Sequence, residues 1–541
     1  MNLQAAFKFV LLATLAIKFI LAWILPMSGD EAYFMVWARH PDFGFYDHPP
    51  MVGWMLQLLL YLGSSEVLLR LPAILLSTLI GLGIYRLLKP YDEVRAALVA
   101  ILFLVSPMNI LNVLVTTDTP LILFVFFSAA SLFKALQKNS MAWYGLSGAL
   151  FGMAFLSKYF AVLLGIAYLA YFIGSALKPV RPELVEGQAG RLDKLKTGFD
   201  KLSPNGVDAS SSPNFSARDK QKLKGAALLF LAALPFVLLN LYWNYTHCWD
   251  NILFNLYNRN EGEQFSPGKV AIFLGTQVYL MTPPVIYYLF KHRAEFRQKI
   301  ERGQFRLFAY AFLLPMAAFA VLSLKKNIGL HWGLAFYPFF YTLLHLLLSR
   351  EELLKSFKFM AWFSAAHLAA IAVTAALPME TWKQNKLYGS IVFMFKNDEI
   401  AEKIRPYEQQ GFALASDGYT SAAIISYHYG KNFSVFGGGS HYARQDDIIT
   451  DFRKFSGSDM LIVKKSAPEM TQYAPYFKRV EVRQFELRGV TFYFVLGYGF
   501  NYDNYRKLVL KPIKDKYYNI PVFLPHAPCY FCEKYFPENV R

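Results

Sequence analysis

The sequence predicts a polytopic α-helical membrane protein that carries a soluble α/β domain at its C-terminal end. Of its 541 residues, 55% are hydrophobic and 17% aromatic, which is too apolar for an ordinary soluble enzyme. Apolar runs of about 20 residues, the length of a membrane helix, recur up to residue 378. The net charge of +17 does not indicate nucleic acid, because the basic residues gather in loops between apolar runs.

About eleven membrane spans are expected from the apolar runs. They cover residues 8–26, 66–88, 94–114, 119–136, 141–157, 159–177, 223–243, 269–290, 306–324, 332–349 and 358–378. The first of them is expected to be a signal anchor rather than a signal peptide, because no small-residue cleavage site follows it and many further spans do.

The loops between these spans alternate in charge. Basic loops at 89–95, 134–138, 178–224, 291–306 and 350–358 are all separated by an even number of spans. The positive-inside rule therefore places them in the cytoplasm and the intervening loops outside. The loop 178–224 is rich in Pro, Gly, Ser and charge without apolar periodicity, so it is expected to be a disordered insert.

The composition becomes that of a soluble domain over residues 379–541, after a membrane domain at 1–378. Short β-rich runs at Phe412–Ser416, Phe433–Phe436, Met460–Val463 and Val490–Leu496 alternate with a helical pattern at Ser421–Tyr429. An odd number of spans places this α/β domain outside the cytoplasm. Gly437–Gly439 is expected to be a turn, since no phosphate-loop or dinucleotide pattern surrounds it.

Residues 27–54 form a loop that is rich in carboxylates, histidines and aromatic side chains. Asp30 and Glu31 follow the first span by only a few residues, where two adjacent carboxylates are costly to bury without a polar partner. The loop ends in Asp47, His48 and two prolines, which favour a rigid extended turn. Its tyrosines, Tyr33 and Tyr46, are candidate substrate contacts, and the plain alternative is an interfacial aromatic belt.

Further polar residues lie on the same predicted outer side. Asp118 precedes Pro120 and suits a helix start, Lys158 and Tyr159 interrupt an apolar stretch, and Asn244 ends a later span. Lys325 and His331 lie in a loop where Lys325 violates the positive-inside rule, so an anionic partner would explain it better than topology does. Caps, snorkelling and interfacial anchoring are the alternative readings of these residues.

Carboxylates, a His and several cations at one membrane face suit transfer of a sugar from an anionic lipid carrier. A carboxylate can accept the proton of an attacking hydroxyl. Cations can stabilise the charge that grows on a departing phosphate. An apolar helical bundle can hold a polyprenyl tail within the membrane lipids.

Five segments of the chain also resemble a known family. GDEAYFMVWARH, YDHPPMVGW, TTDTPL, GALFGMAFLSKY and NLYWNYTH are similar to the bacterial proteins of glycosyltransferase family 39. This is the group like the dolichyl-phosphate-mannose protein mannosyltransferases and related to the lipid A aminoarabinose transferase. The resemblance covers most of residues 20–340. It implies the GT-C fold and inverting transfer of a sugar from a polyprenyl monophosphate.

The resemblance also implies roles for individual residues. Asp30 falls on the expected catalytic base with Glu31 beside it, and Asp118 falls on the second acidic position. His48 takes the place where related members carry a Lys that meets the donor phosphate. Lys158, Arg70 and Lys325 are further phosphate ligands by position, and no metal ligand is assigned.

The function expected from these observations is that of an inner-membrane glycosyltransferase with an undecaprenyl-phosphate-linked sugar as donor. The acceptor would be lipid A, the lipopolysaccharide core or another envelope glycan facing the periplasm. A protein O-glycosyltransferase of the same family and a lipid-linked sugar flippase are the alternatives. The flippase is less favoured because no internal repeat is visible. No organic cofactor is expected, and two carboxylates leave a divalent metal open.

Overall fold

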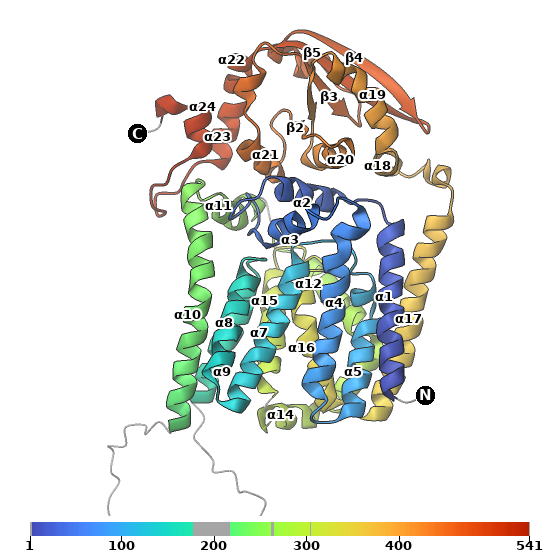
Figure 1. The fold of residues 1–541 in the computed structure, drawn as a ribbon, viewed down its shortest axis with the longest axis vertical. Helices are drawn as coiled ribbons and strands as arrows, with labels where there is room; N and C mark the ends of the chain where they lie inside the picture. The colour runs from blue at the N-terminus through green and yellow to red at the C-terminus, as the bar shows by residue number, and fades with distance from the viewer. Residues whose placement is uncertain (1–2, 177–216, 261–263, 303–304, 540–541) are drawn as a thin grey trace, which may run out of the picture.

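The computed structural model describes residues 3–176, 217–260, 264–302 and 305–539. A bundle of helices forms one half of the molecule, and a domain built on a β-sheet covers one end of it (Figure 1). The loop predicted to be disordered, 178–224, lies mostly outside the described residues. Its last part belongs to the start of helix α10 (Ala217–Thr246).

The bundle contains a helix at the position of each predicted span. Its long helices are α1 (Leu3–Ile24), α4 (Glu66–Leu88), α7 (Asp118–Lys138), α10 and α17 (Arg350–Ala376). Its shorter helices are α5 (Glu93–Val105), α8 (Met141–Phe155), α9 (Ala161–Ala176), α12 (Pro267–Met281), α13 (Pro283–Lys291), α15 (Arg306–Leu322) and α16 (Tyr337–Leu347). Five helices of the described chain are long and apolar enough to cross a membrane, and one bent pair would make a sixth. The count of eleven therefore stays a prediction.

One predicted span is not a single helix. The expected helix over 269–290 is broken into α12 and α13, which meet at an angle of 92°. The break lies at Thr282, whose φ is +70°, directly before two prolines. Proline disfavours helical geometry in the residue before it, and the apolar composition alone conceals that break. The predicted span is therefore a pair of helices with a sharp bend between them.

Close helix packing in the bundle depends on small residues. A Cβ at Gly148 of α8 would overlap the carbonyl of Leu229, and one at Gly152 would overlap the ring of Phe236, both on α10. Small residues spaced four apart allow two membrane helices to approach closely. The interior of the bundle is otherwise filled by aliphatic and aromatic side chains, with Phe126, Phe308 and Phe339 among those fully buried.

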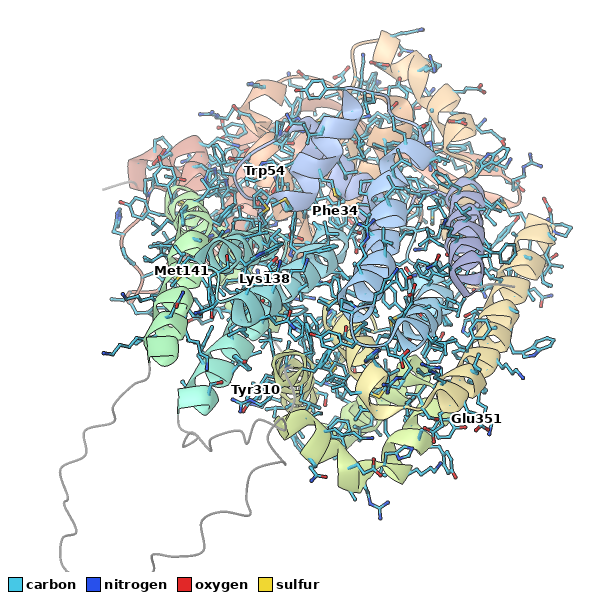
Figure 2. All side chains as sticks on the ribbon, turned by 60° about the horizontal axis from the view of Figure 1, so that its bottom comes forward. Phe34, Trp54, Lys138, Met141, Tyr310 and Glu351 are labelled. Carbon is cyan, nitrogen blue, oxygen red and sulfur yellow. The ribbon has the colours of Figure 1, made fainter. Side chains whose placement is uncertain are left out.

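Two short helices, α2 (Gly29–Arg39) and α3 (Met51–Leu60), lie across the end of the bundle that faces the sheet domain (Figure 1). Figure 2 labels Phe34 on α2 and Trp54 on α3, at the end of the bundle away from Glu351 of α17. Short helices α6 (Pro107–Ile110) and α11 (Asp250–Leu256) and the 3₁₀ turns at Asn258–Asn260 and Leu334–Phe336 interrupt the chain in the bundle, and α14 (Arg293–Arg302) lies at the opposite end (Figure 1).

The domain after α17 is an open five-stranded sheet in the order β2-β1-β3-β5-β4. Its strands are β1 (Ala413–Ser416), β2 (Ser434–Val435), β3 (Met460–Lys464), β4 (Phe477–Leu487) and β5 (Val490–Phe500). Strands β2, β1 and β3 run parallel, and β5 and β4 are antiparallel to their neighbours. Helices α18 (Tyr388–Phe395), α19 (Asn397–Gln409), α20 (Tyr419–Tyr429), α21 (Gln445–Ile449), α22 (Tyr502–Tyr505), α23 (Lys511–Tyr517) and α24 (Tyr530–Tyr535) complete it.

The sheet domain and the bundle share one hydrophobic cluster. It runs from Trp37 of α2 through Ile424 of α20 to Leu461 of β3. Helix α20 packs so closely on α2 that a Cβ at Gly29 would overlap the methyl group of Thr420. The sheet domain is therefore fixed over α2 and over the loops around it.

Candidate functional site

The loops at the sheet-domain end of the bundle enclose a cavity of about 430 Å³, here named the junction cavity. It is lined by Asp30, Tyr33, Phe34, Asp47, His48, Thr116, Thr117, Asp118, Lys158, Arg259, His331, Tyr419 and Tyr442. Seven of the predicted site residues are among them: Asp30, Tyr33, Asp47, His48, Asp118, Lys158 and His331. The structure thus brings together side chains from loops that are far apart in the sequence.

Asp30 is placed by the first turn of α2. Ser28 caps this helix, and the Glu31 carboxylate accepts a hydrogen bond from the backbone N–H of Ser28, which closes a capping box. The box fixes the direction in which the next side chain leaves the helix. Asp30 is exposed to the junction cavity, and partial burial by its walls raises the pKa of Asp30, while His331 acts in the opposite direction.

Glu31 and Arg70 form a buried ion pair that does not line the junction cavity. Arg70 Nε and Nη2 each donate to a carboxylate oxygen of Glu31 at 2.9 Å. The remaining guanidinium donors meet the backbone carbonyls of Ala22, Leu25 and Pro26 at 2.7 to 2.8 Å. Arg70 therefore ties the end of α1 to the start of α2 and has no donor directed at the cavity.

Asp118 and Lys158 form a second buried ion pair, and this one lines the cavity. Lys158 Nζ donates to both carboxylate oxygens of Asp118, at 2.7 and 2.9 Å. His331 Nε2 lies 4.0 Å from Asp118 Oδ2 and is itself exposed. The pair brings the N-terminus of α7 against the junction of α8 and α9, so charge on Lys158 is largely compensated by Asp118.

Asp47 and His48 lie side by side in the wall of the cavity. Asp47 is buried, and within the described chain its Oδ1 has no hydrogen-bond partner. Burial raises the pKa of Asp47 to about 7. Burial, reinforced by Lys158 and Arg259, holds the pKa of His48 well below its ordinary value, so this ring is neutral near pH 7.

Arg259 was missed by the sequence reasoning. It lies on a 3₁₀ turn in a loop that reads as acidic, and its guanidinium packs on the face of Trp332 at 4.9 Å from the ring centroid. No carboxylate of the described residues forms an ion pair with it. A single Arg in a predicted outer loop, against the positive-inside rule, was the available signal.

The sheet domain contributes the roof of the cavity. Tyr419 is the first residue of α20, which follows β1 after a short loop, and Tyr442 lies in a 3₁₀ turn that follows β2. Tyr33 donates a hydrogen bond to the carbonyl of Tyr442 at 3.1 Å, and its ring meets that of Tyr419 edge to face. Nothing in the sequence of a separate soluble domain could have linked these tyrosines to Asp30.

The other predicted residues lie outside the cavity lining. Tyr46 is buried and accepts a hydrogen bond from Asn258 at 3.0 Å. Tyr159 donates to Asn240 at 2.9 Å, and Asn244 accepts from the backbone of Ile252 at 3.1 Å. Lys325 is exposed, and Lys269 donates to its carbonyl. These contacts give Tyr46, Tyr159 and Asn244 packing roles and leave Lys325 away from the cavity.

Among the residues that the structure describes, no group of three or more His, Cys, Asp or Glu side chains could hold a metal ion. Asp118, the second carboxylate that left a metal open, is occupied by Lys158.

Three comparisons relate the chain to known proteins. The sequence profile of the family described as dolichyl-phosphate-mannose-protein mannosyltransferase matches residues 47–184, a segment that contains His48, Asp118 and Lys158. A lipid A galacturonosyltransferase of Rhizobium johnstonii is 26% identical over 134 residues. That match spans 24% of this chain and only 28% of the relative's length.

The fold is similar to that of ArnT from Cupriavidus metallidurans. The apo structure matches with a TM-score of 0.57 at 15% identity, over 92% of this chain and 98% of ArnT. The structure of ArnT bound to undecaprenyl phosphate matches with a TM-score of 0.57 at 14% identity, over 90% of this chain and 97% of ArnT. These matches agree with the resemblance seen in the sequence: one segment of the chain is similar to the mannosyltransferase family and to a lipid A galacturonosyltransferase, and the fold is similar to that of ArnT.

Proposed function

We propose that the protein transfers a sugar from a polyprenyl monophosphate carrier, undecaprenyl phosphate, to lipid A, the lipopolysaccharide core or another envelope glycan. All three comparisons support the glycosyltransferase class. The undecaprenyl phosphate in an ArnT structure supports the donor, and the name of the Rhizobium relative supports a lipid A acceptor.

The observation that carries this proposal is the composition of the junction cavity. An accessible carboxylate, Asp30, shares a cavity of about 430 Å³ with the cations Lys158 and Arg259. Asp118 and Lys158 lie at the ends of apolar helices, so a lipid phosphate could reach them while its tail stays among these helices. A carboxylate and cations in one enclosed site are what an inverting transfer from a phosphate carrier requires.

In the proposed step the acceptor hydroxyl attacks the anomeric carbon from the face opposite the phosphate. The new carbon–oxygen bond forms as the bond to the phosphate oxygen breaks, and the configuration inverts. Asp30 takes the hydroxyl proton. The raised pKa of Asp30 makes it a stronger base than an ordinary aspartate once it is ionised.

The leaving phosphate gains charge and needs fixed positive partners. Asp118 compensates Lys158, whereas Arg259 faces the cavity without a carboxylate partner among the described residues. Arg259 is therefore the main phosphate ligand in this mechanism, with Lys158 second. His48 and His331, whose pKa values are both lowered, act as neutral hydrogen-bond partners near pH 7.

We place the site on the periplasmic side of the bacterial inner membrane. The basic segments 89–95, 291–302 and 350–358 gather at the end of the bundle opposite α2 (Figure 1), where Arg350 pairs with Asp92 at 3.1 Å and Lys291 with Glu352 at 2.9 Å. By the positive-inside rule that end is cytoplasmic. Residues 1–378 then form the catalytic membrane domain and residues 379–541 a periplasmic domain.

The function is tested by deleting the gene and comparing envelope glycans by mass spectrometry. The expected result is the loss of one sugar from lipid A, core or another glycan, restored by the wild-type gene, with the carrier-linked sugar accumulating outside. Loss of a sugar from proteins alone would favour a protein O-glycosyltransferase. Carrier-linked sugar retained on the cytoplasmic leaflet would contradict the proposal and favour a flippase.

A further inference from the structure

A second cavity, of about 490 Å³, lies within the sheet domain and is here named the strand-end cavity. Its lining includes Asp417, Gly437, Gly438, Gly439, Lys464, Tyr473 and Tyr476. None of these residues lines the junction cavity. The volume falls within the range of ordinary small-ligand sites.

The strand-end cavity lies where an open parallel sheet ordinarily binds ligands. Asp417 directly follows β1, Gly437 follows β2 by two residues, and Lys464 ends β3. The chain leaves β1 for β2 on one side and returns to β3 on the other, so the strand order reverses here. The crevice at the carboxyl ends of strands next to such a reversal is the usual ligand position in doubly wound sheets.

Both faces of the sheet are covered by packed side chains. Leu461 and Val463 of β3 belong to the cluster that includes α20, whereas Met460 and Ile462 pack with Tyr505 on the other face. Phe436, Tyr473 and Ile513, which line the cavity, belong to the second of these clusters, so the cavity lies at the strand ends on the face that Tyr505 covers.

The polar groups of the cavity combine donors and acceptors. Lys464 is buried, and its Nζ lies 3.1 Å from Asp417 Oδ2 and donates to the hydroxyl of Tyr473 at 2.9 Å. Sugar hydroxyls both donate and accept hydrogen bonds, so an ammonium beside a carboxylate can serve one hydroxyl each. Tyr476 also lines the cavity, and the face of a tyrosine ring is an electron-rich surface on which the C–H groups of a sugar ring can pack.

The loop Gly437–Gly439, here named the glycine loop, leaves space in the strand-end cavity and has backbone N–H groups without an acceptor among the described residues. Gly437 and Gly439 have φ values of +89° and +57°, which other residues rarely adopt, while a Cβ at Gly438 would meet nothing within 4 Å. Within the described chain the N–H groups of Gly438 and Gly439 have no protein acceptor. A hydroxyl or phosphate oxygen can approach such amides closely.

The two cavities are joined by the same two loops. The loop after β1 places Asp417 in the strand-end cavity and Tyr419, two residues later, in the junction cavity. The loop after β2 places Gly439 in the first and Tyr442, three residues later, in the second. A molecule held by Asp417 and the glycine loop therefore lies one short loop away from the roof of the proposed reaction site.

We propose that the strand-end cavity binds a saccharide unit of the acceptor, distant from the hydroxyl that reacts, and so selects the acceptor glycan. Its hydroxyls contact Lys464, Asp417 and the amides of Gly438 and Gly439, and its ring lies against Tyr476. The identification of this saccharide as part of the acceptor rests on the proposed function. Binding of a saccharide in the cavity can be tested without any transfer reaction.

The test is saturation-transfer NMR on the full-length protein in lipid nanodiscs, with fully deacylated lipid A disaccharide bisphosphate as the probe. Unphosphorylated chitobiose is measured in parallel, and inorganic phosphate, which has no carbon-bound protons to observe, is added as a competitor. Binding of both saccharides is expected; no signal from chitobiose, together with loss of the bisphosphate signal when phosphate is added, would overturn the proposal in favour of a simple anion site.

Two variants locate the binding. Lys464→Met removes the ammonium group and is expected to raise the dissociation constant of the saccharide about tenfold or more. Gly438→Leu fills the space into which its Cβ points, needs no strained backbone, and is expected to block binding. Lys465→Met is the matched control, because Lys465 is the next residue but is exposed and packs on Phe393 instead.

The outcomes separate this inference from the proposed function. Saccharide binding that Gly438→Leu and Lys464→Met leave intact would contradict a site in the strand-end cavity, whatever the protein catalyses. Binding lost in both folded variants but not in Lys465→Met supports the site. If the gene deletion then changes no envelope glycan, the proposed transfer fails while the saccharide site stands.

Discussion

Arg259 and Lys325 are two cations in neighbouring loops with very different surroundings. Arg259 lines the junction cavity and packs on Trp332, whereas Lys325 is exposed and does not line it. The sequence favoured Lys325, because two adjacent lysines violate the positive-inside rule more visibly than one Arg among acids. Only the packing of the loop around Trp332 distinguishes the two.

Replacing Arg259 by Gln is expected to reduce transfer 10²- to 10³-fold, since removing one fixed donor from a developing charge has effects of about that size. Folding should change little because the side chain is partly exposed. Lys325→Gln is the matched control and should retain nearly full activity. The measurement is the initial rate of sugar transfer by purified protein; equal losses in both variants would contradict the assignment.

Because of Asp47, the protein is expected to become less stable as the pH rises. Its pKa rises from 3.8 to about 7 on folding, so between these values the folded protein holds a proton that the unfolded chain has released. The free energy of unfolding therefore falls as pH rises through this window, by roughly 4 kcal/mol in all. Asp47→Asn should remove that fall.

This prediction is tested by thermal unfolding in detergent at pH 4.5 and 7.5. The quantity compared is the difference in melting temperature between wild type and Asp47→Asn at each pH. The variant should gain relative to wild type at the higher pH. Asp42→Asn, in the same loop, controls for the general loss of a carboxylate. A difference that is the same at both pH values would show that Asp47 does not titrate in this window.

At the scale of elements, the structure depends on how α20 of the sheet domain packs on α2. β1, β3, β5 and α20 were predicted from the sequence, whereas α2 was missed because residues 27–54 were predicted to form one loop, although Ser28 and Glu31 have the spacing of a capping box. The long strand β4 was missed because one of its faces carries the charged residues Arg479, Glu481 and Arg483. The bend between α12 and α13 was missed because apolar composition does not report backbone direction.

Gly29→Ala should separate α2 from α20, because the new Cβ would overlap the methyl group of Thr420. Overpacking of this kind costs about 1–3 kcal/mol. Because Tyr419 precedes Thr420, the roof of the junction cavity should move as well and transfer should fall. The melting temperature and the transfer rate are measured together.

The compensating variant Gly29→Ala/Thr420→Ser removes the overlapping methyl group and keeps the hydroxyl. It should recover most of the lost stability and activity. Failure of this second change to restore either quantity would indicate that Gly29 acts through the backbone of α2 and not through its contact with α20.

At the scale of the whole molecule, the charge pattern predicted which loops gather at each end of the bundle. The convergence of Asp30, Asp118, Lys158 and His331 on one cavity agrees with that pattern. Composition predicted a membrane protein, and the motifs predicted the GT-C fold that the likeness to ArnT supports. The contribution of Tyr419 and Tyr442 was not predictable, since no sequence pattern states where a second domain is placed on the first.

The proposed topology predicts opposite labelling of two exposed lysines. In a cysteine-free background, Lys511→Cys of the sheet domain should react with a membrane-impermeant maleimide in intact spheroplasts. Lys355→Cys, near the start of α17, should react only after the membrane is opened. The reverse pattern would place the junction cavity in the cytoplasm and contradict the periplasmic assignment.

The central claim is that Asp30 acts as the base of a sugar transfer in the junction cavity, and one substitution tests it most directly. Asp30→Asn keeps the shape and removes the charge, and Asp42→Asn of the same loop is the control. Each is expressed at equal membrane levels in the deletion strain, and envelope glycans are compared by mass spectrometry. The account predicts that wild type and Asp42→Asn restore a mass increment of one sugar and Asp30→Asn does not; full restoration by Asp30→Asn would contradict it.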